Sequence, residues 1–365
     1  MGRALIFQGA GQPFEIVRYR EPEPRGAEVL VRVTCCTLCR SDLHTHAGRR
    51  VEPTPLVLGH EIIGRIEAFG PSASRCDARG QAASVGARVT WSVTVGCGDC
   101  FFCRENLPQK CERLYKYGHK RREVDRPLGG GLADHIVLVP GTFWLLVPDE
   151  IADRVAAPAN CATATAAAML RSSDAWRVAS GEKKTTRRTV LVLGAGVLGV
   201  TACALARSSG VETVIACDVS PAAVDRARSF GATHGVLADQ ATEGVQEATQ
   251  GRGADVVLEL AGTSASVAMA LRLVRIGGVV VLAGTVTPTA AVAFDPEMVV
   301  RRMLTIRGVH NYAPGDLEAA LAFLAGPGRL LPFASLVGDV FPLEEAERAF
   351  ACAHANPGVR VAVIP

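Results

Sequence analysis

Residues 189–199, TVLVLGAGVLG, decide the fold of this chain. An apolar run leads directly into the motif G-x-G-x-x-G, made by Gly194, Gly196 and Gly199, and a helical pattern begins at Val197 and Leu198. Between a strand and a helix, this motif predicts a turn that binds a dinucleotide. Gly194 allows the tight turn, Gly196 lets the backbone approach a pyrophosphate, and Gly199 lets the helix pack closely on the strand. The amino end of the helix favours the anion.

The cofactor preference is predicted from Asp218, which ends the next apolar run, 19 residues after Gly199. A carboxylate at this place accepts hydrogen bonds from both ribose hydroxyls and repels a 2′-phosphate. We therefore expect NAD rather than NADP. The alternative is a glycine-rich turn followed by an incidental Asp.

The alternation of apolar runs and helical segments starts at residue 189 and continues beyond the motif. Apolar runs alternate with helical segments at 189–194, 214–218, 234–238, 255–262, 278–284 and 304–309. Nearly continuous apolar strands separated by helices predict a doubly wound parallel sheet covered on both faces, within an α/β fold. The first 160 or so residues instead contain short strands (28–34, 64–69 and 88–92) between Gly/Pro turns, with polar loops predicted at 70–86 and 180–188. A helix at 315–326 and short strands follow, and we expect this tail to return to the β-rich part.

Composition limits the class of protein. The chain has 365 residues, 48% hydrophobic and 21% charged, which fits a soluble protein of about two domains. Its net charge of +3 is too small to predict nucleic-acid binding, and no apolar run reaches the roughly 20 residues that span a bilayer. Twelve cysteines without a secretory signal predict a reducing compartment, the cytoplasm, where thiols bind metal or stay free.

Four cysteines predict a closed metal site. Cys97, Cys100, Cys103 and Cys111 have the spacing C-x2-C-x2-C-x7-C on a glycine-containing loop. Zinc held by four thiolates is tetrahedral with no open position, so such a site stabilises structure.

A second, sparser set predicts an open metal site. Cys39, His60 and Cys161 would supply two thiolates and one imidazole, which leaves the fourth position of a catalytic zinc free. Each residue alone has an ordinary explanation, since single cysteines and histidines are often core residues. The closed site and the dinucleotide motif on the same chain favour the metal.

These motifs together resemble the zinc-containing alcohol dehydrogenases of the medium-chain dehydrogenase/reductase superfamily. The resemblance rests on CRSDLH (39–44), GHE (59–61), the four-cysteine segment, Cys161 and GAGVLG (194–199). It implies a GroES-like catalytic domain (1–163 and 310–365, with a zinc lobe at about 96–112) and a Rossmann NAD-binding domain (164–309). It also implies two zinc ions per chain, NAD, a small alcohol or aldehyde substrate, and a homodimer or homotetramer.

The resemblance assigns roles at the open site. Ser41 matches the hydroxyl that hydrogen-bonds the substrate oxygen, and His44 the end of the proton relay. Asp42 matches a residue that orients the ligating histidine. Glu61 matches a carboxylate that can swing onto zinc; a supporting hydrogen bond is the alternative.

Three further residues match cofactor contacts in that family. Arg40 matches a pyrophosphate contact, and Thr165 a residue that faces the nicotinamide. Arg360 is expected at the cofactor phosphates, or else as a solvated surface residue.

The substrate is the least determined part. The basic segment KYGHKRR (116–122) is either a solvated loop or a site for an anionic substrate. Residues 107–119 and 308–312 are similar to a subgroup proposed to act in phosphonate metabolism, which implies a phosphonate-bearing alcohol or aldehyde. The rival functions are a polyol dehydrogenase of the same superfamily and a non-catalytic binding protein on a dehydrogenase scaffold.

Overall fold

The computed structural model describes residues 1–122, 128–173 and 189–365, so the polar loop predicted at 180–188 lies outside the described residues. The chain divides into two compact units. The first contains Met1–Cys161, Ala313–Leu321 and Phe333–Pro365, and the second contains Ala162–Tyr312 and Ala322–Pro332. The grouping changes inside helix α10 (Pro314–Ala325).

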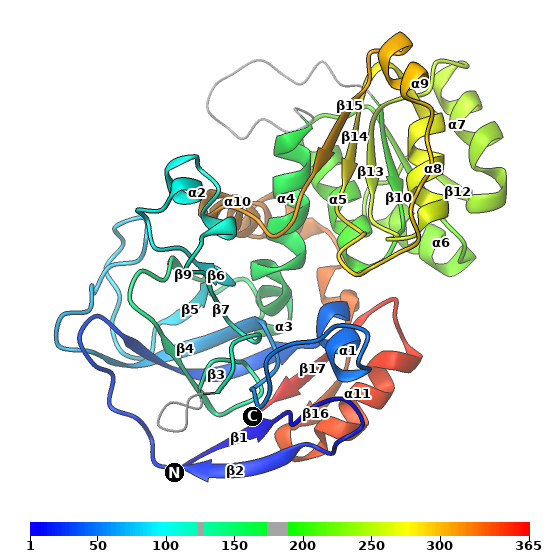
Figure 1. Ribbon diagram of the computed structural model, residues 1–365. Helices are drawn as coiled ribbons and strands as arrows, with labels where there is room; N and C mark the ends of the chain where they lie inside the picture. The colour runs from blue at the N-terminus through cyan, green and yellow to red at the C-terminus, as the bar shows by residue number, and fades with distance from the viewer. Residues whose placement is uncertain (123–127, 174–188) are drawn as a thin grey trace. The chain divides into compact units, whose positions relative to one another are not determined.

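The first unit is built on a seven-stranded, mostly antiparallel sheet (Figure 1). The strand order is β16-β17-β3-β4-β5-β9, with β8 also paired to β3. The strands span Val337–Pro342 (β16), Arg360–Ile364 (β17), Val29–Thr37 (β3), Glu61–Phe69 (β4), Arg88–Trp91 (β5), Trp144–Leu146 (β9) and His135–Leu138 (β8). The tail returns to this sheet, because β17 pairs with β3 through Ala362 and Thr37.

Smaller elements complete the first unit. Two short antiparallel pairs, β1 with β2 and β6 with β7, stand beside the main sheet. The strands and helices are β1 (Gly2–Ile6), β2 (Glu15–Tyr19), β6 (Thr94–Val95), β7 (Tyr115–Lys116), α1 (Arg40–His46), α2 (Phe101–Arg104), α3 (Asp153–Ala156) and α11 (Ala346–Ala355). Trp91, Tyr117 and Phe350 are among the largest fully buried side chains of its core.

The second unit contains a six-stranded parallel sheet with the order β12-β11-β10-β13-β14-β15. Numbered from its own first strand, this order is 3-2-1-4-5-6, the doubly wound order of the Rossmann fold, so the predicted fold class is confirmed. The strands are β10 (Thr189–Leu193), β11 (Thr213–Asp218), β12 (His234–Leu237), β13 (Ala254–Glu259), β14 (Val274–Leu282) and β15 (Thr305–Gly308).

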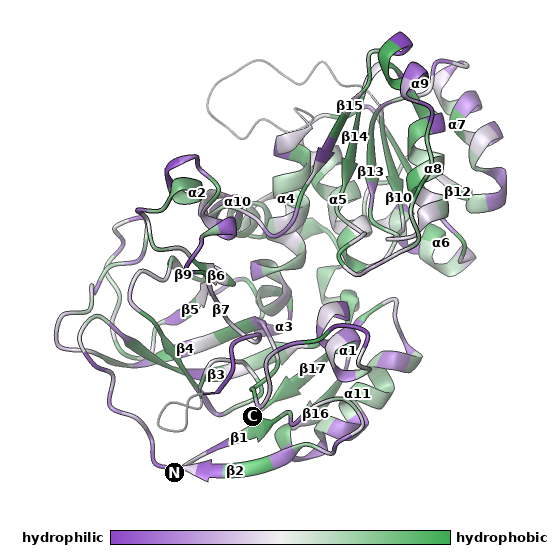
Figure 2. Cartoon of the chain, viewed as in Figure 1, coloured by the Kyte–Doolittle hydropathy of each residue, from purple (hydrophilic) through white to green (hydrophobic). Residues whose placement is uncertain are grey.

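One helix, α4, precedes the first strand of this sheet, and the other helices lie between its strands in sequence. They span Ala162–Ser172 (α4), Val197–Ser208 (α5), Pro221–Ser229 (α6), Ala241–Thr249 (α7), Ser264–Leu273 (α8) and Pro296–Arg301 (α9). The central strands β10 and β13 are hydrophobic along most of their length (Figure 2), because both faces of a parallel sheet are covered. The strand order reverses next to β10, and ligands of this fold bind at the carboxyl ends of the strands at such a point. Among the described residues, no helix has the length and apolar content needed to cross a bilayer.

Candidate functional site

The four cysteines of the predicted closed site converge. The sulfurs of Cys97 and Cys103 lie 4.0 Å apart, and those of Cys100 and Cys111 lie 3.8 Å apart. Four thiolates around a tetrahedral zinc with Zn–S bonds of about 2.3 Å would be about 3.8 Å apart. The backbone amides of Cys97 and Arg113 each donate to the Cys111 sulfur at 3.2 Å, and a backbone hydrogen bond from Glu112 lowers the pKa of Cys100 to about 6. The donor set therefore fits zinc.

The three residues of the predicted open site also meet. Cys39 precedes α1, His60 precedes β4, and Cys161 precedes α4. The two sulfurs are 4.0 Å apart, and the Cys161 sulfur is 3.6 Å from His60 Nε2. Thiolate and imidazole on one tetrahedral zinc would be about 3.5 Å apart. This second donor set fits zinc as well. A carboxylate oxygen of Glu61 also lies within 4.8 Å of the three ligand atoms, so the fourth position is within reach of Glu61 or of another group.

Asp42 fixes the histidine of this set. Its carboxylate lies 3.1 Å from His60 Nδ1 and accepts hydrogen bonds from the backbone amides of Cys39, at 2.9 Å, and Gly59, at 3.3 Å. The side chain is fully buried. Because Nδ1 faces this carboxylate, Nε2 is the nitrogen left for a metal.

A buried amide holds the segments that carry His60 and Cys161 together. Asn160, next to Cys161, is fully buried, and its side-chain nitrogen donates to the backbone oxygens of His60, at 3.1 Å, and Trp91, at 3.0 Å. The sequence analysis did not single out Asn160. Its position next to a predicted ligand was the only available signal.

Arg360 corrects one expectation. The alternative of a solvated surface residue is wrong, because Arg360 is 6% exposed and lies against Glu61. Its guanidinium donates to both carboxylate oxygens of Glu61, at 2.9 and 2.8 Å, and to the Cys39 sulfur at 3.4 Å. Thr37 Oγ1 donates to the same carboxylate at 2.7 Å. The Glu61 carboxylate therefore accepts three side-chain hydrogen bonds, two from Arg360 and one from Thr37. The contact of Arg360 with cofactor phosphates stays a prediction.

The charges of the site favour a metal-binding thiolate. The hydrogen bond to Cys161 lowers the pKa of Cys39 well below its usual value, against burial and with help from Arg360. The same hydrogen bond raises the pKa of Cys161. The two sulfurs therefore share one proton, with Cys39 as the thiolate and Cys161 as the thiol. Burial raises the pKa of Glu61 to about 7, although Arg360 opposes this shift.

Ser41 and His44 lie one turn apart on α1, and both are partly buried. The Ser41 hydroxyl lies 3.3 Å from His60 Nε2, so it borders the metal position. Burial, followed by the charges of Arg40 and Arg49, lowers the pKa of His44, which keeps its imidazole neutral at pH 7. Arg40 is exposed at the start of the same helix.

The cofactor turn is built as the glycine motif predicts. Gly194 has a φ of +97°, and a Cβ on Gly199 would lie 1.9 Å from the Gly194 oxygen, so neither position accepts a side chain. A Cβ on Gly196 would have nothing within 4 Å, so the protein itself gives no reason for glycine there. A bound pyrophosphate would supply that reason, and in this respect the turn fits a dinucleotide.

Asp218 lies beside this turn, at the end of β11. It accepts hydrogen bonds from the backbone amides of Ala195, at 2.7 Å, and Ser220, at 3.0 Å, and stays partly exposed. Thr165 is partly exposed on α4.

The segment 116–122 is not the solvated loop that was considered. Tyr117 is fully buried and His119 is 6% exposed, while Lys120 and Arg121 face solvent. The His119 ring centroid lies 5.0 Å from that of His60. The charged sequence pattern did not indicate that Tyr117 and His119 are buried, because their burial results from tertiary packing.

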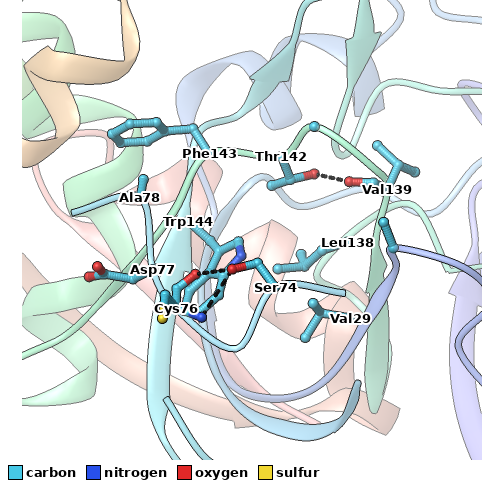
Figure 3. A pocket seen from close by; sticks show the side chains of 12 residues that line it. Val29, Ser74, Cys76, Asp77, Ala78, Leu138, Val139, Thr142, Phe143 and Trp144 are labelled. Carbon is cyan, nitrogen blue, oxygen red and sulfur yellow. Dashed lines mark hydrogen bonds between the residues drawn. The ribbon is translucent and has the colours of Figure 1, made fainter. Parts of the chain in front are cut away.

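A cavity of about 370 Å³ lies elsewhere in the first unit (Figure 3). Polar groups in its wall bond to one another: Ser74 Oγ donates to the Cys76 oxygen at 3.1 Å, and Thr142 Oγ1 donates to the Val139 oxygen at 2.6 Å. None of the residues that line it belongs to either cysteine set. It is therefore separate from the candidate metal site.

Known proteins share these features. An alcohol dehydrogenase GroES-like domain matches residues 25–149, and a zinc-binding dehydrogenase domain matches residues 197–326. A probable alcohol dehydrogenase of Mycobacterium tuberculosis is 33% identical over 94% of this chain and 92% of its own length. An L-threonine 3-dehydrogenase of Deinococcus radiodurans is 31% identical over 85% of this chain and 83% of its own length.

Solved structures agree in fold. An alcohol dehydrogenase of Thermotoga maritima superposes with a TM-score of 0.89 at 27% identity, over 100% of this chain and 99% of that one. A putative zinc-binding dehydrogenase of Sinorhizobium meliloti bound to NADP superposes with a TM-score of 0.85 at 25% identity, over 100% and 99%.

The fold and the relatives, together with two cysteine-containing clusters that could hold metal ions, thus define a class: the zinc-binding dehydrogenases with a GroES-like and a Rossmann domain. The chain belongs to the zinc-dependent alcohol dehydrogenase family of the medium-chain dehydrogenase/reductase superfamily. It is a zinc-dependent alcohol oxidoreductase, and the rival hypothesis of a non-catalytic scaffold protein has no support in these relatives.

Proposed function

We propose that this protein oxidises an alcohol, or reduces the corresponding aldehyde or ketone, with NAD and a zinc ion held by Cys39, His60 and Cys161. The observation that carries this proposal is the separation of the three ligand atoms, 4.0 Å between sulfurs and 3.6 Å from Cys161 to His60 Nε2. These distances match one tetrahedral zinc. Asp42 orients His60 from behind, and the set leaves one position open to substrate.

Zinc and NAD would supply the reactive chemistry when bound. Zinc would act as a Lewis acid that lowers the pKa of an alcohol hydroxyl, and the nicotinamide would accept a hydride.

The residues of the chain manage the proton. Ser41 borders the open position and would accept the hydroxyl proton of the substrate through its Oγ. His44, neutral at pH 7 because burial lowers its pKa, would receive that proton toward solvent. Arg360 and Thr37 engage the carboxylate of Glu61, which supports its role as a supporting carboxylate. The alternative role as a zinc ligand is favoured by its position, since one of its oxygens lies within 4.8 Å of the other ligand atoms.

A second zinc would be held by Cys97, Cys100, Cys103 and Cys111. Their four sulfurs leave no position open, so this zinc would fix the loop and take no part in the reaction. Two zinc ions per chain are therefore expected.

The proposed cofactor is NAD rather than NADP, with the pyrophosphate at Gly194–Gly199 and contacts from Arg40 and Thr165. Asp218 supports NAD because its partly exposed carboxylate would repel a 2′-phosphate. The NADP-bound relative from Sinorhizobium meliloti keeps the alternative open to experiment.

An assembly and a location are also proposed. Strand β15 pairs only with β14 among the described residues, and Ile306, Val300 and Met303 near this edge are exposed. Such an edge can pair with a second copy across a two-fold axis, which favours a homodimer or a homotetramer. Twelve free cysteines suit the reducing cytoplasm.

Metal content together with turnover tests the proposal. The purified protein should contain two zinc ions per chain and reduce NAD with a small alcohol. Cys39→Ser and Cys161→Ser should each abolish turnover and lower the zinc content toward one, while Cys76→Ser, an exposed cysteine outside both sets, should change neither. One zinc per wild-type chain, or undiminished turnover in the two ligand variants, would contradict the proposal. A screen of alcohols, polyols and aldehydes by NADH absorbance would distinguish a polyol dehydrogenase from a dehydrogenase of simple alcohols.

A further inference from the structure

Lys116 belongs to a segment that packs against the candidate catalytic zinc site through Gly118 and His119. It belongs to β7, where it pairs with Thr94 of β6, and the next residues pack on the zinc ligand. A Cβ on Gly118 would lie 3.0 Å from the His60 Cβ and 2.7 Å from the Gly59 oxygen, which leaves no room between the two segments. The segment that carries Lys116 is therefore fixed against the segment that carries His60.

The charged neighbours of Lys116 are already engaged. Glu52 accepts from Arg50 Nε at 2.7 Å and lies 2.9 Å from His119 Nδ1. Within residues 1–122, 128–173 and 189–365, the Lys116 ammonium has no ion pair or hydrogen bond, although the side chain is partly buried. Among these described residues, no carboxylate is paired directly with the Lys116 ammonium.

The metal site does not supply Lys116 with an anion once it is loaded. Cys39 and Cys161 are near enough to act electrostatically on Lys116, together with Arg50 and Glu52. Two thiolates and a neutral imidazole on Zn²⁺ sum to zero charge. The carboxylates around them are already engaged, because Arg360 binds both oxygens of Glu61, and Asp42 binds His60 and two backbone amides. A loaded site therefore offers the ammonium no free anionic group. A partly buried charge without a partner is unfavourable. The alternative is a lysine whose stem covers apolar surface while its head reaches water.

We propose that Lys116 binds an anionic group of the substrate, so that the enzyme prefers alcohols and aldehydes that carry a carboxylate, phosphonate or phosphate. This inference rests on the proposed function, because it places the substrate at the zinc held by Cys39, His60 and Cys161. The phosphonate-bearing alcohol considered from the sequence is one member of this class.

The test compares substrates of similar size on matched variants. The substrates are 1-butanol, 3-hydroxypropionate and 2-hydroxyethylphosphonate, and the variants are Lys116→Met, Lys116→Arg and the control Lys120→Met, an exposed lysine on the same segment. We expect the ratio of kcat/KM for anionic over neutral substrate to fall about 10- to 100-fold in Lys116→Met, the range of one hydrogen bond to a charged group. It should fall less in Lys116→Arg and stay unchanged in Lys120→Met. The two anionic substrates distinguish carboxylate from phosphonate.

A binding measurement separates this inference from the proposed function. Calorimetry with the unreactive propylphosphonate, on zinc-loaded protein with NAD, should give binding to wild type that weakens at least tenfold in Lys116→Met. If wild type oxidises 1-butanol but shows no preference for anionic substrates, and Lys116→Met keeps the wild-type ratio, the inference is wrong and the proposed function stands. If wild type has one zinc and oxidises nothing, both fail. Unchanged zinc content in Lys116→Met would show that the variant has kept its fold.

Discussion

Replacing Arg360 by Gln should destabilise the first unit by removing the partner of a buried carboxylate. Glu61 is fully buried, and Arg360 gives it two hydrogen bonds of 2.9 and 2.8 Å. Removing one member of a buried ion pair costs about 3–5 kcal/mol, because a charge is left without compensation. Burial already holds the pKa of Glu61 at about 7, so protonation of the orphaned carboxylate offsets part of this cost. We therefore expect the lower end, about 3 kcal/mol.

Calorimetric unfolding of the zinc-loaded protein measures this loss. For a unit of this size, about 3 kcal/mol lowers the unfolding midpoint by about 6–12 °C. The matched control is Arg228→Gln, which breaks an exposed pair with Asp225, and exposed pairs contribute about 0–1 kcal/mol. A chelator should also remove one zinc faster from the Arg360 variant, because Arg360 also donates to the Cys39 sulfur. Equal midpoints and equal zinc loss in the two variants would refute the reasoning.

Three further predictions concern the other sites. Cys103→Ser should lose one zinc ion and unfold at a lower temperature, whereas Cys76→Ser should keep both ions. Atomic emission spectroscopy of the purified proteins measures the zinc content per chain and checks this prediction. Asp218→Asn should lower the KM for NADP relative to NAD about tenfold, since weakening a charged hydrogen bond to a neutral one changes about 1–1.5 kcal/mol; steady-state kinetics with both cofactors would expose an unchanged ratio. Burial and Arg50 lower the pKa of Lys116 to about 8, so the ammonium is charged below that pH and neutral above it. The KM for 3-hydroxypropionate relative to 1-butanol should therefore rise between pH 7 and 9.5 in wild type and stay flat in Lys116→Arg.

Features encoded by short spacings could be predicted from the sequence. The four cysteines lie within fifteen residues, and the glycine motif directly follows an apolar run, so local geometry brings the groups together. The doubly wound parallel sheet could also be predicted, because apolar strands that alternate with helices are compatible with only a few sheet topologies.

Features that depend on distant segments could not be predicted in the same way. Arg360 and Glu61 are 299 residues apart, and only the pairing of β17 beside β3 brings them into contact. Lys116 and His119 resemble a solvated basic loop because charge is visible in a sequence, whereas the packing of Gly118 on His60 is not. The family resemblance placed Arg360 near functional groups but did not identify its partner.

The pairing of β17 with β3 constrains the order in which the chain can mature on the ribosome. The strand that carries Arg360 is synthesised after the whole Rossmann sheet, whose strands β10 to β15 are contiguous in sequence. The sheet of the second unit can therefore form as soon as it emerges, whereas the sheet of the first unit is complete only once β17 has paired with β3. Until then the Glu61 carboxylate lacks the guanidinium of Arg360. Newly made protein should consequently complete the zinc site of Cys39, His60 and Cys161 only after β17 has emerged.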